Sequence, residues 1–400
     1  MIEVGFAELC CARAVFILRD KEETVAMLTL HVDDGLLAGD EGNQRYQRAV
    51  RDINSKFKIK EWHDLKKGTA NYLGMRWTQD DRGVTLDMDE YIGNLTVMEL
   101  KKPVQEEVKL DDGTVHIFRS VLAKVRWPVS HVVPELAYAV SSLAQVGPTA
   151  LTWEQARQLN LVVTTLKKMA QAGQARIVLP RLRGNQVTVV TPFDASFAKE
   201  PGLKSQAGFM SFLTTGDLTK GEVPGALVEY QSTTISRVVK STLASESASL
   251  STALDRQLYL RLLVQSLLEG EPTYAPDWRH RLTVPGILVT DAKSLYDHLN
   301  TTGKIPKERQ TMIDLLVARD LIEANAVRLC WVPTKHMLAD ILTKMMAPGE
   351  VFRMFRDKQI YSLIRNDEEQ EEEQRRLGLR QGQRQRRKAR VKGMTEADGA

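Results

Sequence analysis

Four acidic residues have the side-chain type and the spacing that could form one metal-binding cluster. Intervals of 52, 45 and 49 residues separate them, in the order Asp194, Glu246, Asp291 and Asp340. Like charges that gather in one place repel one another unless something cationic neutralises them. Hard divalent ions with oxygen ligands do so, and a pair of such ions can drive phosphodiester cleavage. The chemistry that these residues suggest is therefore metal-assisted hydrolysis.

The segments around the four acids are predicted to form the strands and helices of one α/β layer. Residues 186–348 have the pattern β-β-β-α-β-α-β-α, with leading strands at 186–194, 207–213 and 226–232. A long amphipathic helix is predicted over 241–268, and a short one over 337–346. The acids lie at strand ends or in first helical turns of this pattern. Such placement lets carboxylates from distant parts of the chain converge at one end of a sheet.

Each acid also has an ordinary structural explanation. Asp194 and Asp291 could be solvated residues at strand ends, and Asp291 could also cap the helix predicted after it. Glu246 and Asp340 could be first-turn acids, which the helix dipole favours. Pro192 is expected to end or bulge the first strand, because proline lacks the N–H that a central strand uses. The order and spacing of the four acids together favour a shared site.

The N-terminal part is predicted to contain two hairpins and several helices. The first hairpin pairs 25–32 with 36–38, and the turn residues between them are Asp33, Asp34 and Gly35. The second pairs 72–78 with 84–87. Helical patterns are predicted at 43–58, 91–100, 134–145 and 152–172. Prolines punctuate the helical stretch from 119 to 173, at Pro128, Pro134 and Pro148.

Composition narrows the class of protein. A hydrophobic content of 43% with 26% charged residues is ordinary for a globular protein, and the net charge of +4 is compatible with nucleic acid. Three cysteines argue against a disulfide framework and against a zinc site. No run approaches the roughly 20 apolar residues of a membrane span. The first residues do not form a signal peptide, so we expect a cytoplasmic or nuclear protein without a membrane partner.

Motifs over residues 1–346 resemble the C-terminal part of the Pol polyprotein of copia-type retrotransposons. Residues 30–38 (LHVDDGLLA) resemble the reverse-transcriptase YVDD hairpin. Further segments resemble the region that connects it to the ribonuclease H domain, at 72–75, 88–92, 118–121 and 134–143. Six segments resemble the ribonuclease H domain in family order, at 193–198, 204–208, 241–246, 290–294, 332–334 and 339–344.

The chain departs from the family pattern at several positions. His31 replaces the tyrosine of the polymerase motif, Ala292 replaces an asparagine, and Glu135 replaces an aspartate. The sequence starts only about 30 residues before Asp33, so the first polymerase aspartate, the fingers and most of the palm would lie upstream. We therefore expect Asp33 and Asp34 to be a vestigial polymerase metal pair without polymerase activity.

The resemblance implies an α/β (α+β) fold. Its main part would be a ribonuclease H-like mixed five-stranded sheet with flanking helices, preceded by a truncated palm and thumb remnant. The expected domains are a palm remnant at 1–100, a helical thumb or connection at 101–180, a ribonuclease H-like domain at 181–350, and a charged, disordered tail at 351–400.

The resemblance also implies an activity: hydrolysis of the RNA strand of RNA–DNA hybrids. The four acids would hold two Mg²⁺ ions, with Mn²⁺ as a possible substitute, and the rest of a Pol polyprotein would be a further partner. Contacts to the sugar-phosphate backbone are expected from Ser205, Gln206, Ser232, Lys240, Ser241 and Lys344. His336 could shuttle protons or could be an ordinary exposed residue. The alternatives are an inactive nucleic-acid-binding remnant and an unstable gene fragment.

Overall fold

The computed structural model describes residues 1–100, 107–184, 186–270, 281–300, 306, 308–324 and 327–363. Two compact units result. Of the described residues, the larger unit contains those within 1–216 and 224–361, and the smaller one contains 217–223 with 362 and 363. The larger unit contains three sheets and all the residues that the sequence singles out as candidate metal ligands.

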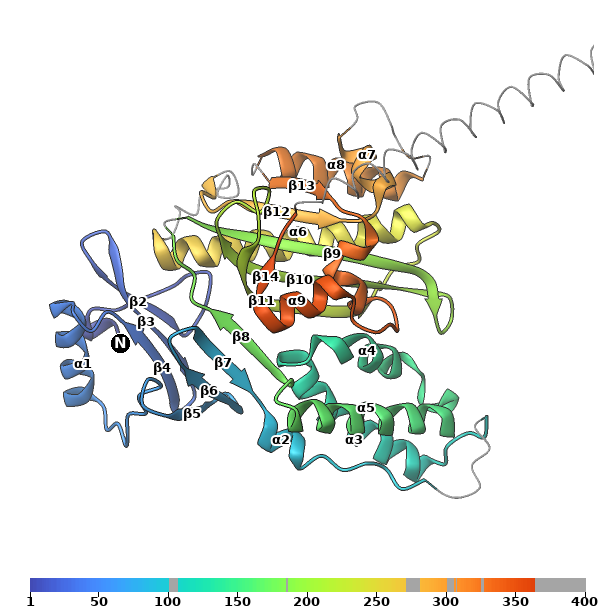
Figure 1. Ribbon diagram of the computed structural model, residues 1–400, viewed down its shortest axis with the longest axis horizontal. Coiled ribbons are helices and arrows are strands. Elements are labelled where there is room, and N and C mark those ends of the chain that lie inside the picture. The colour runs from blue at the N-terminus through green and yellow to red at the C-terminus, as the bar shows by residue number, and fades with distance from the viewer. Residues whose placement is uncertain are drawn as a thin grey trace, which may run out of the picture. The chain divides into compact units, whose positions relative to one another are not determined.

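The central sheet has the strand order β13-β12-β9-β10-β11-β14 (Figure 1). Strands β9, β10 and β11 are antiparallel neighbours, whereas β9, β12 and β13 run parallel. The predicted mixed five-stranded sheet is confirmed, and the two-residue β14 adds a sixth strand at one edge. The bounds are Val187–Glu200 for β9, Lys204–Thr215 for β10, Val223–Thr234 for β11, Gly286–Thr290 for β12, Val327–Trp331 for β13 and Ile360–Tyr361 for β14.

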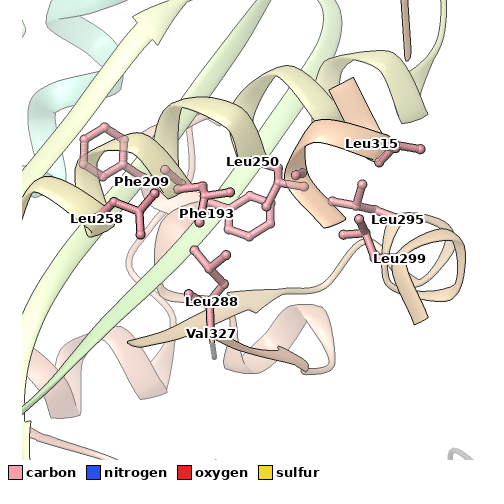
Figure 2. Close-up of a cluster of buried hydrophobic side chains, with 12 residues drawn as sticks. Phe193, Phe209, Leu250, Leu258, Leu288, Leu295, Leu299, Leu315 and Val327 are labelled. Carbon is pink, nitrogen blue, oxygen red and sulfur yellow. The ribbon is translucent and has the colours of Figure 1, made fainter. Parts of the chain in front are cut away.

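The helix α6, at Thr242–Leu268, packs against β9 and β10, and its bounds agree with the predicted helix. Leu250, Leu254 and Leu258 recur every four residues, so one face of α6 enters a core with Phe193 and Leu288 (Figure 2). Two helices, not the single predicted one, lie between β12 and β13. They are α7 at Lys293–Asn300 and α8 at Arg309–Ala324. The last predicted helix is instead the short 3₁₀ helix η6, at Leu338–Leu342.

The leading strand β9 does not end at Asp194 as predicted. It passes through Pro192 and continues to Glu200. Pro192 lies opposite Val289, at the last paired position between β9 and β12. The missing N–H of the proline therefore falls where this ladder stops, and the strand tolerates it. As a result Asp194 lies inside the strand, opposite Gly208 of β10.

Two smaller sheets form the N-terminal part, and both predicted hairpins are present. One sheet has the order β1-β2-β3-β4 and the other β5-β6-β7-β8. Val32 and Asp33 form the first turn, one residue earlier than predicted, and Asp34 already lies in β4 opposite His31. The bounds are Ala7–Glu8, Val15–Asp20, Glu23–His31 and Asp34–Gly39 for β1 to β4, and Thr69–Tyr72, Met75–Gln79, Gly83–Asp87 and Arg176–Pro180 for β5 to β8.

The helices before the central sheet depart from prediction in two places. The helix α2 ends at Gly93, not near residue 100, because glycine followed by Asn94 is a poor continuation of a helix. The helix α3 passes through Pro128, which was expected to interrupt it. The bounds are Ile2–Val4 for η1, Gln44–Lys56 for α1, Asp89–Gly93 for α2, Asp112–His131 for α3, Pro134–Leu136 for η2, Ala137–Gln145 for α4, Pro148–Ala150 for η3 and Trp153–Gln171 for α5.

The first residues of the predicted tail, 351–400, include a helix. The helix α9, at Glu350–Lys358, is amphipathic and buries Phe352 and Phe355. The charged residues 364–400 lie outside the described residues. Within the part of the chain that is described, no helix combines the length and the apolar character needed to cross a bilayer. The predicted domain boundaries at 100, 180 and 350 stay predictions.

Candidate metal centre

Two neighbouring parallel strands bring Asp194 and Asp291 together. Val289 of β12 lies opposite Pro192 of β9. The paired positions end there: Asp291 follows Thr290, the last residue of β12, and Asp194 lies two residues beyond Pro192 in β9. Neighbouring parallel strands are about 4.8 Å apart, and one carboxylate oxygen of Asp291 lies within 4.8 Å of one of Asp194. The sequence order of the elements alone did not determine this register.

Asp340 completes a group of three carboxylates with these two residues. One carboxylate oxygen from each lies within 4.8 Å of the other two. Asp194 is 2% exposed and Asp340 is 5% exposed, whereas Asp291 is half-buried. Three elements that are far apart in the chain, β9, the end of β12 and η6, therefore supply one compact set of oxygen ligands.

Glu246 of α6 lies near this group, close enough for Asp194 and Asp291 to affect its pKa, but it is not one of the three acids whose oxygens lie within 4.8 Å of one another. Ser249, one turn along the helix, donates a hydrogen bond of 2.8 Å from its Oγ to the main-chain oxygen of Asp194. This bond fixes the helix face that carries Glu246 against β9. The Glu246 side chain is buried, and its Oε2 has no hydrogen-bond partner in the described residues. A buried carboxylate oxygen without a partner is costly, and a bound cation would satisfy it.

The segment that carries Asp340 is held against the sheet by a close approach at Gly208. A Cβ atom there would lie 2.5 Å from Cβ of Leu342 and 3.0 Å from Cγ2 of Thr343, so only glycine fits. Ser232 of β11 donates a 2.6 Å hydrogen bond to the main-chain oxygen of Leu342. Thr343 donates from its Oγ1 to Oδ2 of Asp194. These contacts position the fourth acid on the sheet.

Burial opposes ionisation of every acid in the cluster. It raises the pKa of Asp194 to about 6, while the nearby Lys344 opposes this rise. Burial, with Asp194 and then Asp291 beside it, raises the pKa of Glu246 well above its usual range. Burial also raises the pKa of Asp291 and of Asp340. A set of oxygen ligands whose ionised forms repel one another fits a hard divalent cation such as Mg²⁺ or Mn²⁺.

Hydroxyl groups around the cluster orient its carboxylates, and sequence reasoning missed them. Thr334 donates a 2.7 Å hydrogen bond from Oγ1 to Oδ2 of Asp291. Thr343 does the same for Asp194. Thr343 could have been noticed, because it follows Asp340 by three residues, which is one turn of a helix. Thr334 lies 43 residues after its partner, and although it ends the segment 332–334 that resembles the family, nothing in that segment indicates a contact with Asp291.

Most of the residues predicted to contact nucleic acid bond to other parts of the protein. Ser205 and Gln206 are buried. Ser205 accepts a hydrogen bond from the amide of Ala198, and the Gln206 amide lies 2.7 Å from Oγ of Ser232. Ser241 caps the N-terminus of α6, and Lys344 contacts the acids. Of the six predicted residues, Lys240 is the one left exposed without such a role in the described part of the chain.

The N-terminal pair is arranged differently from the four acids. Asp33 and Asp34 are both exposed, at the tip of the β3–β4 hairpin. Among the described residues, no third His, Cys, Asp or Glu joins them in a group that could hold a metal ion. His336 is half-buried at the end of the 3₁₀ helix η5, Thr334–His336.

Comparisons with solved structures return low similarities, and no family model and no curated protein matches the chain. RNase H1 from the halophilic archaeon Halobacterium salinarum NRC-1 is similar over 40% of this chain and 95% of its own, with 19% identity and a TM-score of 0.25. The N-terminal RNase H domain from Mycobacterium tuberculosis is similar over 40% and 91%, with 18% identity and a TM-score of 0.25. The foamy viral protease-reverse transcriptase in complex with RNA/DNA hybrid is similar over 81% and 37%, with 14% identity and a TM-score of 0.45. All three TM-scores are below 0.5.

Proposed function

We propose that the domain built on the central sheet hydrolyses the RNA strand of RNA–DNA hybrids with the help of two divalent metal ions. The observation that carries this proposal is the meeting of Asp194, Asp291 and Asp340 within 4.8 Å, with Glu246 buried beside them. The ordered motifs between residues 193 and 344 support the choice of a copia-type ribonuclease H over other metal-dependent nucleases.

The four acids would hold the ions, and the surrounding residues would hold the acids. When bound, the ions would lower the pKa of an attacking water and stabilise the leaving 3′ oxygen. Thr334 and Thr343 each donate to one carboxylate and so leave the other oxygens of Asp291 and Asp194 for coordination. Substrate choice would depend on the 2′-hydroxyl and the shape of the hybrid, not on base identity.

The proposal does not extend to DNA synthesis. Asp33 and Asp34 are exposed, and no third residue of a metal-binding type groups with them among the residues that the structure describes. Two-metal nucleotidyl transfer needs ligands that surround the ions. We therefore assign the chemistry of this chain to the C-terminal cluster.

The test is a labelled RNA–DNA hybrid incubated with purified protein and Mg²⁺. We expect cleavage of the RNA strand by the wild type, and none by Asp194→Asn or when EDTA is added. Double-stranded DNA of the same sequence is the control substrate and should stay intact. Binding of the hybrid without cleavage by the wild type would favour the inactive nucleic-acid-binding alternative.

A further inference from the structure

Lys344 places its ammonium group inside the acidic cluster. Its Nζ lies 2.6 Å from Oδ1 of Asp340 and 3.3 Å from Oδ2 of Asp194. Sequence reasoning assigned this lysine to the sugar-phosphate backbone of a substrate, but its side chain points to the acids. The ammonium therefore occupies space between two carboxylates that the proposed function assigns to divalent ions.

The backbone at Lys344 is held in place, but its side chain can move. The amides of Thr343 and Lys344 both donate to the main-chain oxygen of Asp340, at 3.1 Å each. The main-chain oxygen of Leu342 accepts a hydrogen bond from Ser232, and the Thr343 hydroxyl donates one to Asp194. The Lys344 side chain is 30% exposed and its stem is flexible. The ammonium can thus leave the cluster while the segment that carries Asp340 keeps its position.

The charges of the cluster balance in two different ways. Four ionised carboxylates carry four negative charges, and two divalent ions supply four positive ones. When two divalent ions are bound, the four negative charges are already balanced, so the positive charge of Lys344 is in excess. In this structure the ammonium of Lys344 contacts Asp194 and Asp340. The same position therefore suits either the ammonium or an ion, since like charges at this distance repel strongly.

We infer that Lys344 is a built-in counter-cation: its ammonium neutralises the metal-free cluster, competes with divalent ions for the carboxylates, and swings out when the ions bind. This inference rests on the proposed function, because it takes the four acids to be metal ligands. Its consequence is that the lysine raises the metal concentration at which the site fills and keeps the acids together before it fills.

The first test measures metal affinity by calorimetry, with Mg²⁺ and Mn²⁺ alone and no substrate. Lys344→Met keeps an unbranched side chain but removes the charge. We expect it to bind the metal at least about tenfold more tightly than the wild type, because a competing positive charge has gone. Lys204→Met is the matched control, since Lys204 is exposed at the start of β10, and should bind like the wild type. Equal or weaker binding by Lys344→Met would overturn the inference.

The second test uses the wild-type protein, so it does not depend on how a variant folds. Amines are methylated with formaldehyde and a borohydride, and labelling of each lysine is measured by mass spectrometry with and without Mg²⁺. We expect labelling of Lys344 to rise several-fold with Mg²⁺, while that of Lys204 stays constant. Metal binding without a rise at Lys344 would reject only the role of the lysine. The absence of metal binding in both wild type and Lys344→Met would reject the metal centre as well.

Discussion

Two sets of acids in this chain share their chemistry but not their surroundings. Asp33 and Asp34 are adjacent in sequence and exposed at a hairpin tip. Asp194 and Asp340 are 146 residues apart in sequence, at most 5% exposed and close neighbours in space. Burial and convergence, not the residue type or proximity in sequence, distinguish a candidate metal centre from a solvated pair.

The backbones of the two regions differ as well. The hairpin tip holds Val32 at a φ of 53°, in the left-handed region that a β-branched residue rarely adopts. The buried acids instead depend on Gly208, where a side chain would collide with the segment that carries Asp340. The hairpin tip thus has a strained backbone at Val32 but no buried acids. At Gly208, by contrast, the close approach of two segments holds Asp340 beside the other buried acids.

The largest expected effect comes from removing one acid of the cluster. Asp340→Asn should lower the rate of hybrid cleavage by at least about 100-fold, because it removes a charged ligand from the site. Asp33→Asn is the matched substitution in the hairpin and should leave the rate unchanged. Steady-state cleavage of a labelled hybrid in Mg²⁺ measures both. A comparable loss in the two variants would end the distinction between the regions.

A pH effect on stability should follow from the buried acids. Burial raises the pKa of Asp194 from 3.8 to about 6 in the folded protein. Between these values the folded state binds a proton that the unfolded chain has released, so stability falls as the pH rises through this window. We expect a loss of roughly 1 to 3 kcal/mol in metal-free protein.

Urea unfolding in EDTA at several pH values between 4 and 7 measures this loss. Asp194→Asn removes one titrating group and should reduce the dependence, to which Glu246, Asp291 and Asp340 still contribute, whereas Asp34→Asn should keep it in full. Addition of Mg²⁺ near pH 7 should restore stability to the wild type, because a ligand that binds only the folded state stabilises it. If the stability of Asp194→Asn depended on pH as steeply as that of the wild type, the effect could not come from Asp194.

A third prediction concerns the close approach at Gly208. Gly208→Ala should destabilise the protein by about 1 to 3 kcal/mol, because the added methyl group has no room beside Leu342 and Thr343. Cleavage activity should fall with it, since Asp340 shifts. Gly93→Ala, at a helix end with open space around it, should change stability by no more than about 0.5 kcal/mol. Thermal unfolding compares the two.

The smallest effect is expected at the hairpin tip. Val32→Gly should stabilise the protein slightly or leave it unchanged, by up to about 1 kcal/mol, because glycine adopts a positive φ without steric cost. Val238→Gly, at another exposed valine, provides the comparison for loss of an exposed side chain. Clear destabilisation by Val32→Gly alone would mean that the valine makes a contact that compensates for its backbone.

Much of the central sheet could be predicted because its signals are local. Short runs rich in apolar residues mark β9 and β12, and leucines spaced for one helix face mark α6. Two of the errors concern prolines that remain within a regular element. Pro192 stays within a strand because its missing N–H falls at the end of one ladder, and Pro128 stays within α3.

The sequence by itself determined the types of the four acids, their order and the strands and helices that carry them, because these properties depend on neighbouring residues. Only the tertiary structure decided that Asp291 lies near Asp194, that Thr334 and Thr343 donate to them, and that Lys344 contacts Asp194 and Asp340. Register and packing between distant segments depend on which surfaces fit and bury one another, and no short stretch of sequence contains that information.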